Sequence, residues 1–233
     1  MLPKIDTPTS EHKIASTGKT IEYRPFLVKE DKILMLAMQD GNYQEMVKAC
    51  IQIVNNCTFN KIDAGNLPIF DLQDLFLQIR MLSVGEIQNF NLICGEDDCG
   101  ESINYELNLG DLVVEGLDRL PDDEIEVGDE FVIKMKWPSA LDLIKGDDKQ
   151  VSDLELVSDC IQSIVTDEEE TLVENVDKEE LEDFINDLPI DAFERMRKFI
   201  HGMPVLQHTV EYSCPKCETE QLVGINGYEH FFG

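Results

Sequence analysis

The length, composition and charge of this chain exclude several classes of protein. It has 233 residues, 42% of them hydrophobic, which is enough for one large domain or two small ones with a buried core. Forty-eight acidic residues against 19 basic ones give a formal net charge of −29, so the chain should repel nucleic acid and anionic membranes and prefer protein partners or cations. The excess lies after residue 50, because residues 1–50 hold seven basic and seven acidic side chains.

The amino terminus shows no secretory signal, and no apolar run approaches the roughly 20 residues that a membrane span needs. We therefore expect a soluble protein made in a reducing cytoplasm, with no membrane and no nucleic-acid partner. In that compartment the seven cysteines should be thiols or metal ligands rather than disulfides.

The amino-terminal part of the chain predicts a polar arm, a strand and three helices. Residues 1–20 are polar and form the expected arm, and residues 20–28 alternate enough to form a strand. In the second and third helices, apolar residues recur at three- and four-residue steps, Gly41 ends the first helix and Asp71 caps the third. The three helices are expected over residues 29–40, 43–54 and 72–82.

A two-residue period replaces the helical pattern after residue 86. Residues 87–110 predict a strand, a cysteine-containing turn and a second strand. A second hairpin should follow, with its turn at Val127-Gly128-Asp129. The end of the chain, residues 205–233, again predicts a strand, a cysteine-containing turn and a strand.

Helical patterns return after Pro138 and end at Gly202. Each is preceded by a polar residue with a glutamate three positions later, which is the pattern of a capping box. The three pairs are Ser152 with Glu155, Asp177 with Glu180, and Asp191 with Glu194. The first of these helices should carry a stripe of Val157, Cys160, Ile161 and Ile164. The predicted class is therefore α+β, a helical domain interrupted by β-hairpins.

These patterns divide the chain into five segments. We expect a polar arm (1–20), a mainly helical region (21–86), a first cysteine hairpin (87–110), an inserted hairpin plus helical region (111–204), and a second cysteine hairpin with a carboxy-terminal tail (205–233).

Four cysteines form two close pairs in the predicted hairpins. Cys94 and Cys99 lie in "CGEDDC", and Cys214 and Cys217 lie in "CPKC". A zinc ribbon is built in this way, from two hairpins that each give two thiolates to one tetrahedral ion. We therefore expect the two hairpins to form a zinc-ribbon-like unit. The 114 residues between the pairs are tolerable because loop-closure entropy grows slowly with length.

A site of four cysteines leaves no coordination position for water or substrate, so its single zinc ion would be structural. The alternative is that these four residues are incidental free thiols. Cys50 and Cys160 lie on apolar stripes and should belong to the core. Cys57 follows the second helix and should be a buried or half-buried thiol.

The sequence shows no catalytic arrangement. With 48 carboxylates, close acidic pairs arise by chance, and neither a nucleophile elbow nor a phosphate-binding glycine loop is present. His208, six residues before Cys214, is a poor alternative metal ligand. The acidic run 167–183 lacks the spacing of a calcium loop and should be a solvated loop and helix face, and Trp137 should anchor the core. We expect no enzyme. The remaining histidines are His12, His201 and His230.

Three stretches carry more specific patterns. They are "STGKTIEYRPFLVKEDKILMLAMQDGN" near the start, "NLPIFDLQDLFLQIRMLSVGEIQNFNLIC" in the middle, and "FINDLPIDAFERMRKFIHGMPVLQHTVEYSC" followed by "LVGINGYEHFF" at the end. With these stretches the chain resembles, over nearly its full length, the baseplate hub-subunit and hub-assembly family of T-even-like bacteriophages.

The resemblance implies non-enzymatic work at the phage tail. The protein would be a central hub subunit of a contractile-tail baseplate, or an assembly factor, a chaperone that leaves. Its partners would be other baseplate hub or wedge proteins, in the host cytoplasm during assembly or in the virion baseplate for a subunit. The acidic part of the chain would suit a basic protein partner.

Six residues are candidates for contact with such a partner: Tyr23, Arg24, Pro25, Phe26, Phe231 and Phe232. The alternative is that they are ordinary core or turn residues. Two other functions stay open, a small acidic zinc-ribbon regulator that binds a host protein such as RNA polymerase, and an acidic mimic of DNA.

Overall fold

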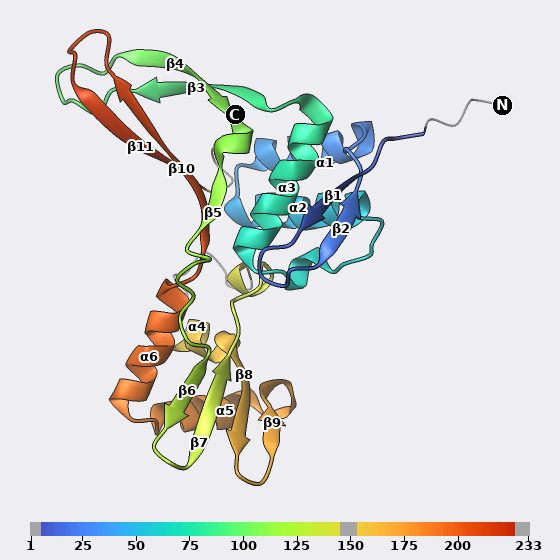
Figure 1. Cartoon of the computed structure of the whole chain (residues 1–233), viewed down its shortest axis with the longest axis vertical. Coiled ribbons are helices and arrows are strands. Elements are labelled where there is room, and N and C mark those ends of the chain that lie inside the picture. The colour runs from blue at the N-terminus through green and yellow to red at the C-terminus, as the bar shows by residue number, and fades with distance from the viewer. Residues whose placement is uncertain (1–5, 145–152, 227–233) are drawn as a thin grey trace. The chain divides into compact units, whose positions relative to one another are not determined.

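The computed structural model describes residues 6–144 and 153–226 and divides the chain into two compact units (Figure 1). Unit 1 combines Met1–Glu115 with Val205–Gly233, and unit 2 is the intervening segment Gly116–Pro204. Each unit is described by itself. Within the described parts of the chain, no helix combines the length and apolar character needed to span a membrane.

Three helices supply most of the core of unit 1. Helix α2 packs against both α1 and α3, and Gly41, at φ 66°, ends α1 as predicted. The Asn42 side chain caps α2 by accepting a hydrogen bond from the Gln44 N–H. Most periodic apolar residues of α3 are buried, among them Leu72 and Phe76, whereas Leu82 is exposed. The helices are α1 (Val28–Asp40), α2 (Tyr43–Cys57) and α3 (Ile69–Val84).

The predicted polar arm contains a strand, so that part of the prediction is wrong. Strand β1 (Ser10–Lys13) pairs antiparallel with β2 (Thr20–Tyr23). β2 ends well before residue 28 because Pro25 has no N–H to give to a ladder. The polar side chains of β1 alternate between exposed and half-buried positions, which composition alone does not reveal.

Asp71 does not cap α3, which begins two residues earlier, at Ile69. The Asp71 side chain is buried in the first turn, and its Oδ1 accepts hydrogen bonds from the N–H groups of Ala15 (3.0 Å) and Ser16 (3.2 Å). Burial raises the pKa of Asp71. The carboxylate predicted as a cap thus ties the β1–β2 turn to the helix.

Arg24 is buried beneath the surface of unit 1 and forms an ion pair. Its Nη2 lies 3.0 Å from Oε1 of Glu30, which is fully buried, and its Nη1 donates to the Pro25 carbonyl at 2.8 Å. Burial alone would raise the pKa of Glu30, but hydrogen bonds from Arg24 and the Leu27 N–H hold it below its usual value. Tyr23 is buried as well, so for Tyr23 and Arg24 the alternative of ordinary core residues is confirmed.

The candidate contacts Phe231 and Phe232 lie outside the described residues. Pro25 and Phe26 are half-buried, and the Phe26 N–H donates to Ser83 Oγ at 2.9 Å. This bond fixes the start of α1 against the last turn of α3.

Two long hairpins and a short strand complete unit 1, as predicted for both cysteine-bearing segments. The central strand of the three-stranded sheet is β10, which pairs antiparallel with β11 on one side and with β5 on the other. β5 and β10 also contact α3. The strands are β3 (Ile87–Ile93), β4 (Ser102–Asn108), β5 (Val113–Glu115), β10 (Val205–Ser213) and β11 (Glu220–Asn226).

Over residues 116–144 and 153–204, unit 2 has a four-stranded antiparallel sheet, in the order β6-β7-β8-β9, with three α-helices. The β6–β7 turn falls where the sequence predicts it, with Gly128 at φ 58°. The elements are β6 (Glu124–Val127), β7 (Phe131–Met135), α4 (Asp153–Cys160), β8 (Ile161–Thr166), β9 (Glu170–Leu172), α5 (Lys178–Asn186) and α6 (Ile190–His201).

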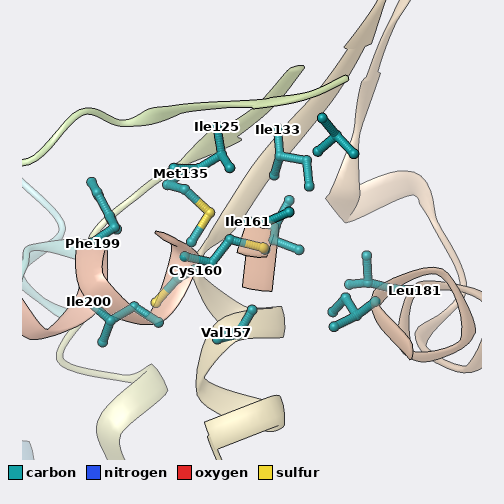
Figure 2. Close-up of a cluster of buried hydrophobic side chains, with 13 residues drawn as sticks. Ile125, Ile133, Met135, Val157, Cys160, Ile161, Leu181, Phe199 and Ile200 are labelled. Carbon is teal, nitrogen blue, oxygen red and sulfur yellow. The ribbon is translucent and has the colours of Figure 1, made fainter. Parts of the chain in front are cut away.

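The core of unit 2 forms where the sheet and helices meet (Figure 2). It gathers Ile133 of the sheet, Val157 of α4, Leu181 of α5 and Phe199 of α6. Trp137 packs against this cluster and stacks on Phe199, with ring centroids 4.1 Å apart and planes 10° apart. The prediction that Trp137 anchors the core is confirmed.

One predicted helix is in fact a helix followed by a strand. Val157 and Cys160 lie on α4, but Ile161 and Ile164 belong to β8. In β8 buried Ile161 and Ser163 alternate with an exposed residue, and the strand is rich in β-branched side chains, which favour sheets. These four apolar residues are spaced three or four positions apart, which is also the spacing of a helix, so the sequence predicted one continuous helix.

The predicted caps have different outcomes. Asp177 caps α5 by accepting a hydrogen bond from the Glu179 N–H at 3.0 Å. Asp191 does not cap α6, which begins one residue earlier after Pro189. Ser152 lies outside the described residues. The acidic run 167–183 holds β9 and the first part of α5, with most of its side chains exposed.

Replacing Arg24 tests the buried ion pair. Arg24→Ala should lower the free energy of unfolding by about 3–5 kcal/mol, because it removes the buried partner of a buried carboxylate and leaves only the exposed Lys29, 3.4 Å from Glu30 Oε1. Lys61→Ala removes an exposed pair with Glu22 and should have little effect, because solvent screens such pairs. Urea unfolding followed by circular dichroism measures both, and similar effects of the two changes would contradict a stabilising role for Arg24.

The same variant carries a pH signature. The pKa of Glu30 is lowered in the folded protein, so its pair with Arg24 stabilises at neutral pH and is lost as the pH falls through the folded-state pKa. The difference in the free energy of unfolding between wild type and Arg24→Ala should therefore become smaller at acidic pH.

Candidate metal centre

Backbone hydrogen bonds shape both cysteine turns in the same way. In the β3–β4 turn, the Cys94 N–H donates to the Glu101 carbonyl at 2.9 Å. In the β10–β11 turn, the Cys214 N–H donates to the Thr219 carbonyl at 3.0 Å, and the Glu218 N–H donates to the Cys214 carbonyl at 2.9 Å. Backbone hydrogen bonds thus hold the shape of each turn without the help of a ligand.

The residue after the second cysteine has the left-handed backbone conformation in both turns. Gly100 has φ 55° and Glu218 has φ 60°. Glycine adopts this conformation without steric cost, whereas a residue with a side chain is strained there. The positive φ turns the chain back toward the second strand of each hairpin.

The two turns bring all four predicted cysteines to one place. Their Sγ atoms lie within 4.8 Å of one another, with Cys94 3.7 Å from Cys217 and Cys99 3.6 Å from Cys214. Both short distances join one hairpin to the other. Within residues 6–144 and 153–226 this is the one group of three or more histidine, cysteine or acidic side chains placed to hold a metal ion.

The cluster fits a tetrahedral ion. Zinc–sulfur bonds of about 2.3 Å imply sulfur–sulfur edges of about 3.8 Å in a regular tetrahedron, close to the 3.6 and 3.7 Å separations between the hairpins. Four sulfur donors suit zinc better than calcium or magnesium, which prefer oxygen. Cys94 and Cys214 are buried, Cys99 is half-buried and Cys217 is exposed, so the site lies near the surface of unit 1.

Lys216 also joins the two hairpins. Its Nζ donates a hydrogen bond to the Cys99 carbonyl at 2.9 Å and lies 3.5 Å from Oε2 of Glu101. Four thiolates around a divalent ion carry a net negative charge, which a nearby lysine offsets.

The four thiols do not have equal acidity. Hydrogen bonds from the Thr219 side chain and N–H lower the pKa of Cys217 to about 6. The Glu96 N–H would lower the pKa of Cys94, but burial and the neighbouring thiols raise it to about 12. Because a metal binds thiolates, occupation of this site would release protons and weaken as the pH falls.

The remaining cysteines and histidines lie elsewhere. Cys50 and Cys160 are buried in the core, as predicted. Cys57 ends α2 rather than following it, and burial raises its pKa to about 11. His208 lies on β10, opposite Ile225. His201 ends α6, and His230 is outside the described residues.

One contact of a histidine was missed by sequence reasoning. His12 Nε2 lies 2.7 Å from Asp74 Oδ2, joining β1 to α3. The alternating pattern "SEHK" was the available signal for a strand there, but nothing local to it points to a partner 62 residues away.

Comparisons with known proteins place the chain in a family. The family described as "T4 bacteriophage base plate protein" matches residues 7–233. This chain belongs to that family. It is also 24% identical, over 215 residues, to the "Baseplate hub assembly protein gp26" of Enterobacteria phage T4. The alignment covers 92% of this chain and 93% of that protein. No solved structure matches the chain.

Membership in the T4 base plate protein family confirms the resemblance seen in the three sequence stretches. Neither description names a metal. The metal centre therefore rests on the geometry of the four cysteines alone.

Exchanging residues at the two left-handed positions tests the turn geometry. Gly100→Ala should destabilise the protein by about 1 kcal/mol, because the added side chain meets no neighbour but disfavours positive φ. Glu218→Gly should have the opposite sign, since it removes that strain, although the unfolded chain gains freedom. Thermal unfolding measures both, and a shift of the same sign for the two variants would contradict the assignment.

Proposed function

We propose that this protein is a non-enzymatic assembly factor for the central hub of a contractile-tail baseplate. The observation that carries the proposal is the match to the T4 base plate protein family over residues 7–233. Support for assembly in particular comes from the T4 relative, which is named a hub assembly protein and aligns over nearly the whole of both chains.

The chemistry of the chain supports a role without catalysis. Its one candidate metal site among the described residues consists of four cysteines, which leave no coordination position for a substrate. Work of this kind would take place in the host cytoplasm, where baseplate parts assemble.

The charge distribution supports a basic partner among the baseplate hub or wedge proteins. Unit 2 contains 26 acidic and nine basic residues, and unit 1 contains 22 and ten. Charge of one sign accelerates encounter with a partner of the other sign and disfavours wrong partners. The comparisons give no support to the alternative of a regulator that binds host RNA polymerase.

We also propose that Cys94, Cys99, Cys214 and Cys217 hold one structural zinc ion and that the two hairpins act as a zinc-ribbon-like unit. The close approach of sulfur atoms from different hairpins supports this assignment. A bound ion would cross-link β3–β4 to β10–β11 and so join segments far apart in the sequence. Zinc peptides gain roughly 10–16 kcal/mol from such binding, comparable to the whole stability of a domain.

Metal content and chelation test the zinc site. Native mass spectrometry of the protein purified with zinc should find one ion per chain, and Cys99→Ser and Cys214→Ser should each lose it. Cys50→Ala is the matched control, because this cysteine lies outside the cluster and its loss should leave the ion in place. A strong chelator under reducing conditions should lower the melting temperature. Absence of the ion, or unchanged melting, would rule out a stabilising metal.

Fractionation of infected cells tests the assembly role. Mass spectrometry should find the protein with hub and baseplate intermediates but not in purified virions, and loss of its gene should leave hubs incomplete. Amounts in virions equal to those of a hub component would make it a subunit instead. Recovery with host RNA polymerase, and with neither tail fraction, would contradict both forms of the proposal.

A further inference from the structure

Helix α1 exposes several large apolar side chains on its outer side. Leu34 and Ala37 are buried against the core of unit 1, yet on the outer side Val28, Met35 and Leu36 are 72%, 56% and 67% exposed. Large apolar side chains that gather on an exposed face often mark an interaction surface. The outer face of α1 therefore has the character of an interface.

A groove runs beside this face, between α1 and α2. It has a volume of about 550 Å³, and its lining is mixed. Leu36, Ala37 and Ala49 are apolar, whereas residues such as Asp40 and Lys48 are charged. Leu36 thus borders both the groove and the solvent. An apolar side chain from another molecule that contacts Leu36 is therefore also placed at the edge of the groove.

Two oppositely charged residues of α1 lie at equal distances along the helix on either side of Leu36. Lys32 precedes it by four residues and Asp40 follows it by four, so all three lie along one side of the helix. Both charged residues are exposed, and neither has an ion-pair partner within the part of the chain that the structure describes. When a second copy of this stripe runs in the opposite direction, each lysine faces an aspartate and the two leucines face each other.

We propose that the outer face of α1 is a homodimer interface, with two α1 helices packed antiparallel about a two-fold axis at Leu36. In this arrangement Lys32 of each copy lies opposite Asp40 of the other, and the two Leu36 side chains meet. A two-fold interface uses the same patch on both copies, as this stripe requires. A parallel arrangement would instead oppose like charges.

The net charge of −29 does not prevent this association. Residues 1–50, which contain α1, hold equal numbers of acidic and basic side chains, so the excess acid lies outside this segment. At physiological ionic strength, charges more than about 8 Å apart are largely screened. The interface depends neither on the metal site nor on a role in the baseplate.

Sedimentation equilibrium of the full chain at 0.15 M salt tests the dimer. The mass should rise with concentration from 26.5 kDa toward twice that value. Leu36→Glu should weaken self-association at least about tenfold, because it opposes two carboxylates at the axis. Ile190→Glu is the control, since Ile190 is 73% exposed but lies on α6 of unit 2, and it should leave association unchanged. Circular dichroism verifies that each variant is folded.

Charge reversal tests the antiparallel register. Lys32→Glu and Asp40→Lys should each weaken the dimer several-fold, because each brings like charges together. The double variant restores opposite charges at both pairs and should restore association.

Three results would overturn the proposal. If the wild-type protein stays monomeric from micromolar to millimolar concentration, the α1 face is not a homodimer interface and a different protein must cover it. A dimer that tolerates Leu36→Glu would use another surface. A double charge reversal that associates no better than the single variants would exclude the antiparallel register.

Discussion

The antiparallel pairing of β5 with β10 is the constraint on which the rest of unit 1 depends. Val205 lies opposite Glu115 and Gln207 opposite Val113, so the chain returns to unit 1 beside the point where it left. Unit 2 can then occupy the intervening sequence at little cost, because loop-closure entropy grows slowly with length. The same β10 strand continues to Cys214, and so carries the second pair of cysteines back to the first.

Features that depend on short stretches of sequence could be predicted. The stripe of α2, the Gly128 turn and the two cysteine hairpins follow from local periodicity and spacing. The α4–β8 boundary could not, because Val157 through Ile164 fit a helical period as well as a helix followed by a strand. Only packing in unit 2 distinguishes the two.

Contacts between distant residues explain the other errors. For Arg24 the sequence left open a partner contact or an ordinary core position, and for Asp71 it predicted a helix cap. Each is buried because partners elsewhere in the chain satisfy it, Glu30 and the Asn56 carbonyl for Arg24 and the β1–β2 turn for Asp71. Conversely, the exposure of Leu36 follows from which side of α1 faces α2, which its mixed pattern did not indicate.

In unit 1 the polar contacts of Arg24 and Asp71 hold separate segments together. The central physical proposal is that one metal ion joins hairpins from the two parts of unit 1. X-ray absorption at the zinc edge tests it most directly. The account predicts four sulfur ligands at about 2.3 Å, and nitrogen or oxygen ligands at about 2.0–2.2 Å would contradict it.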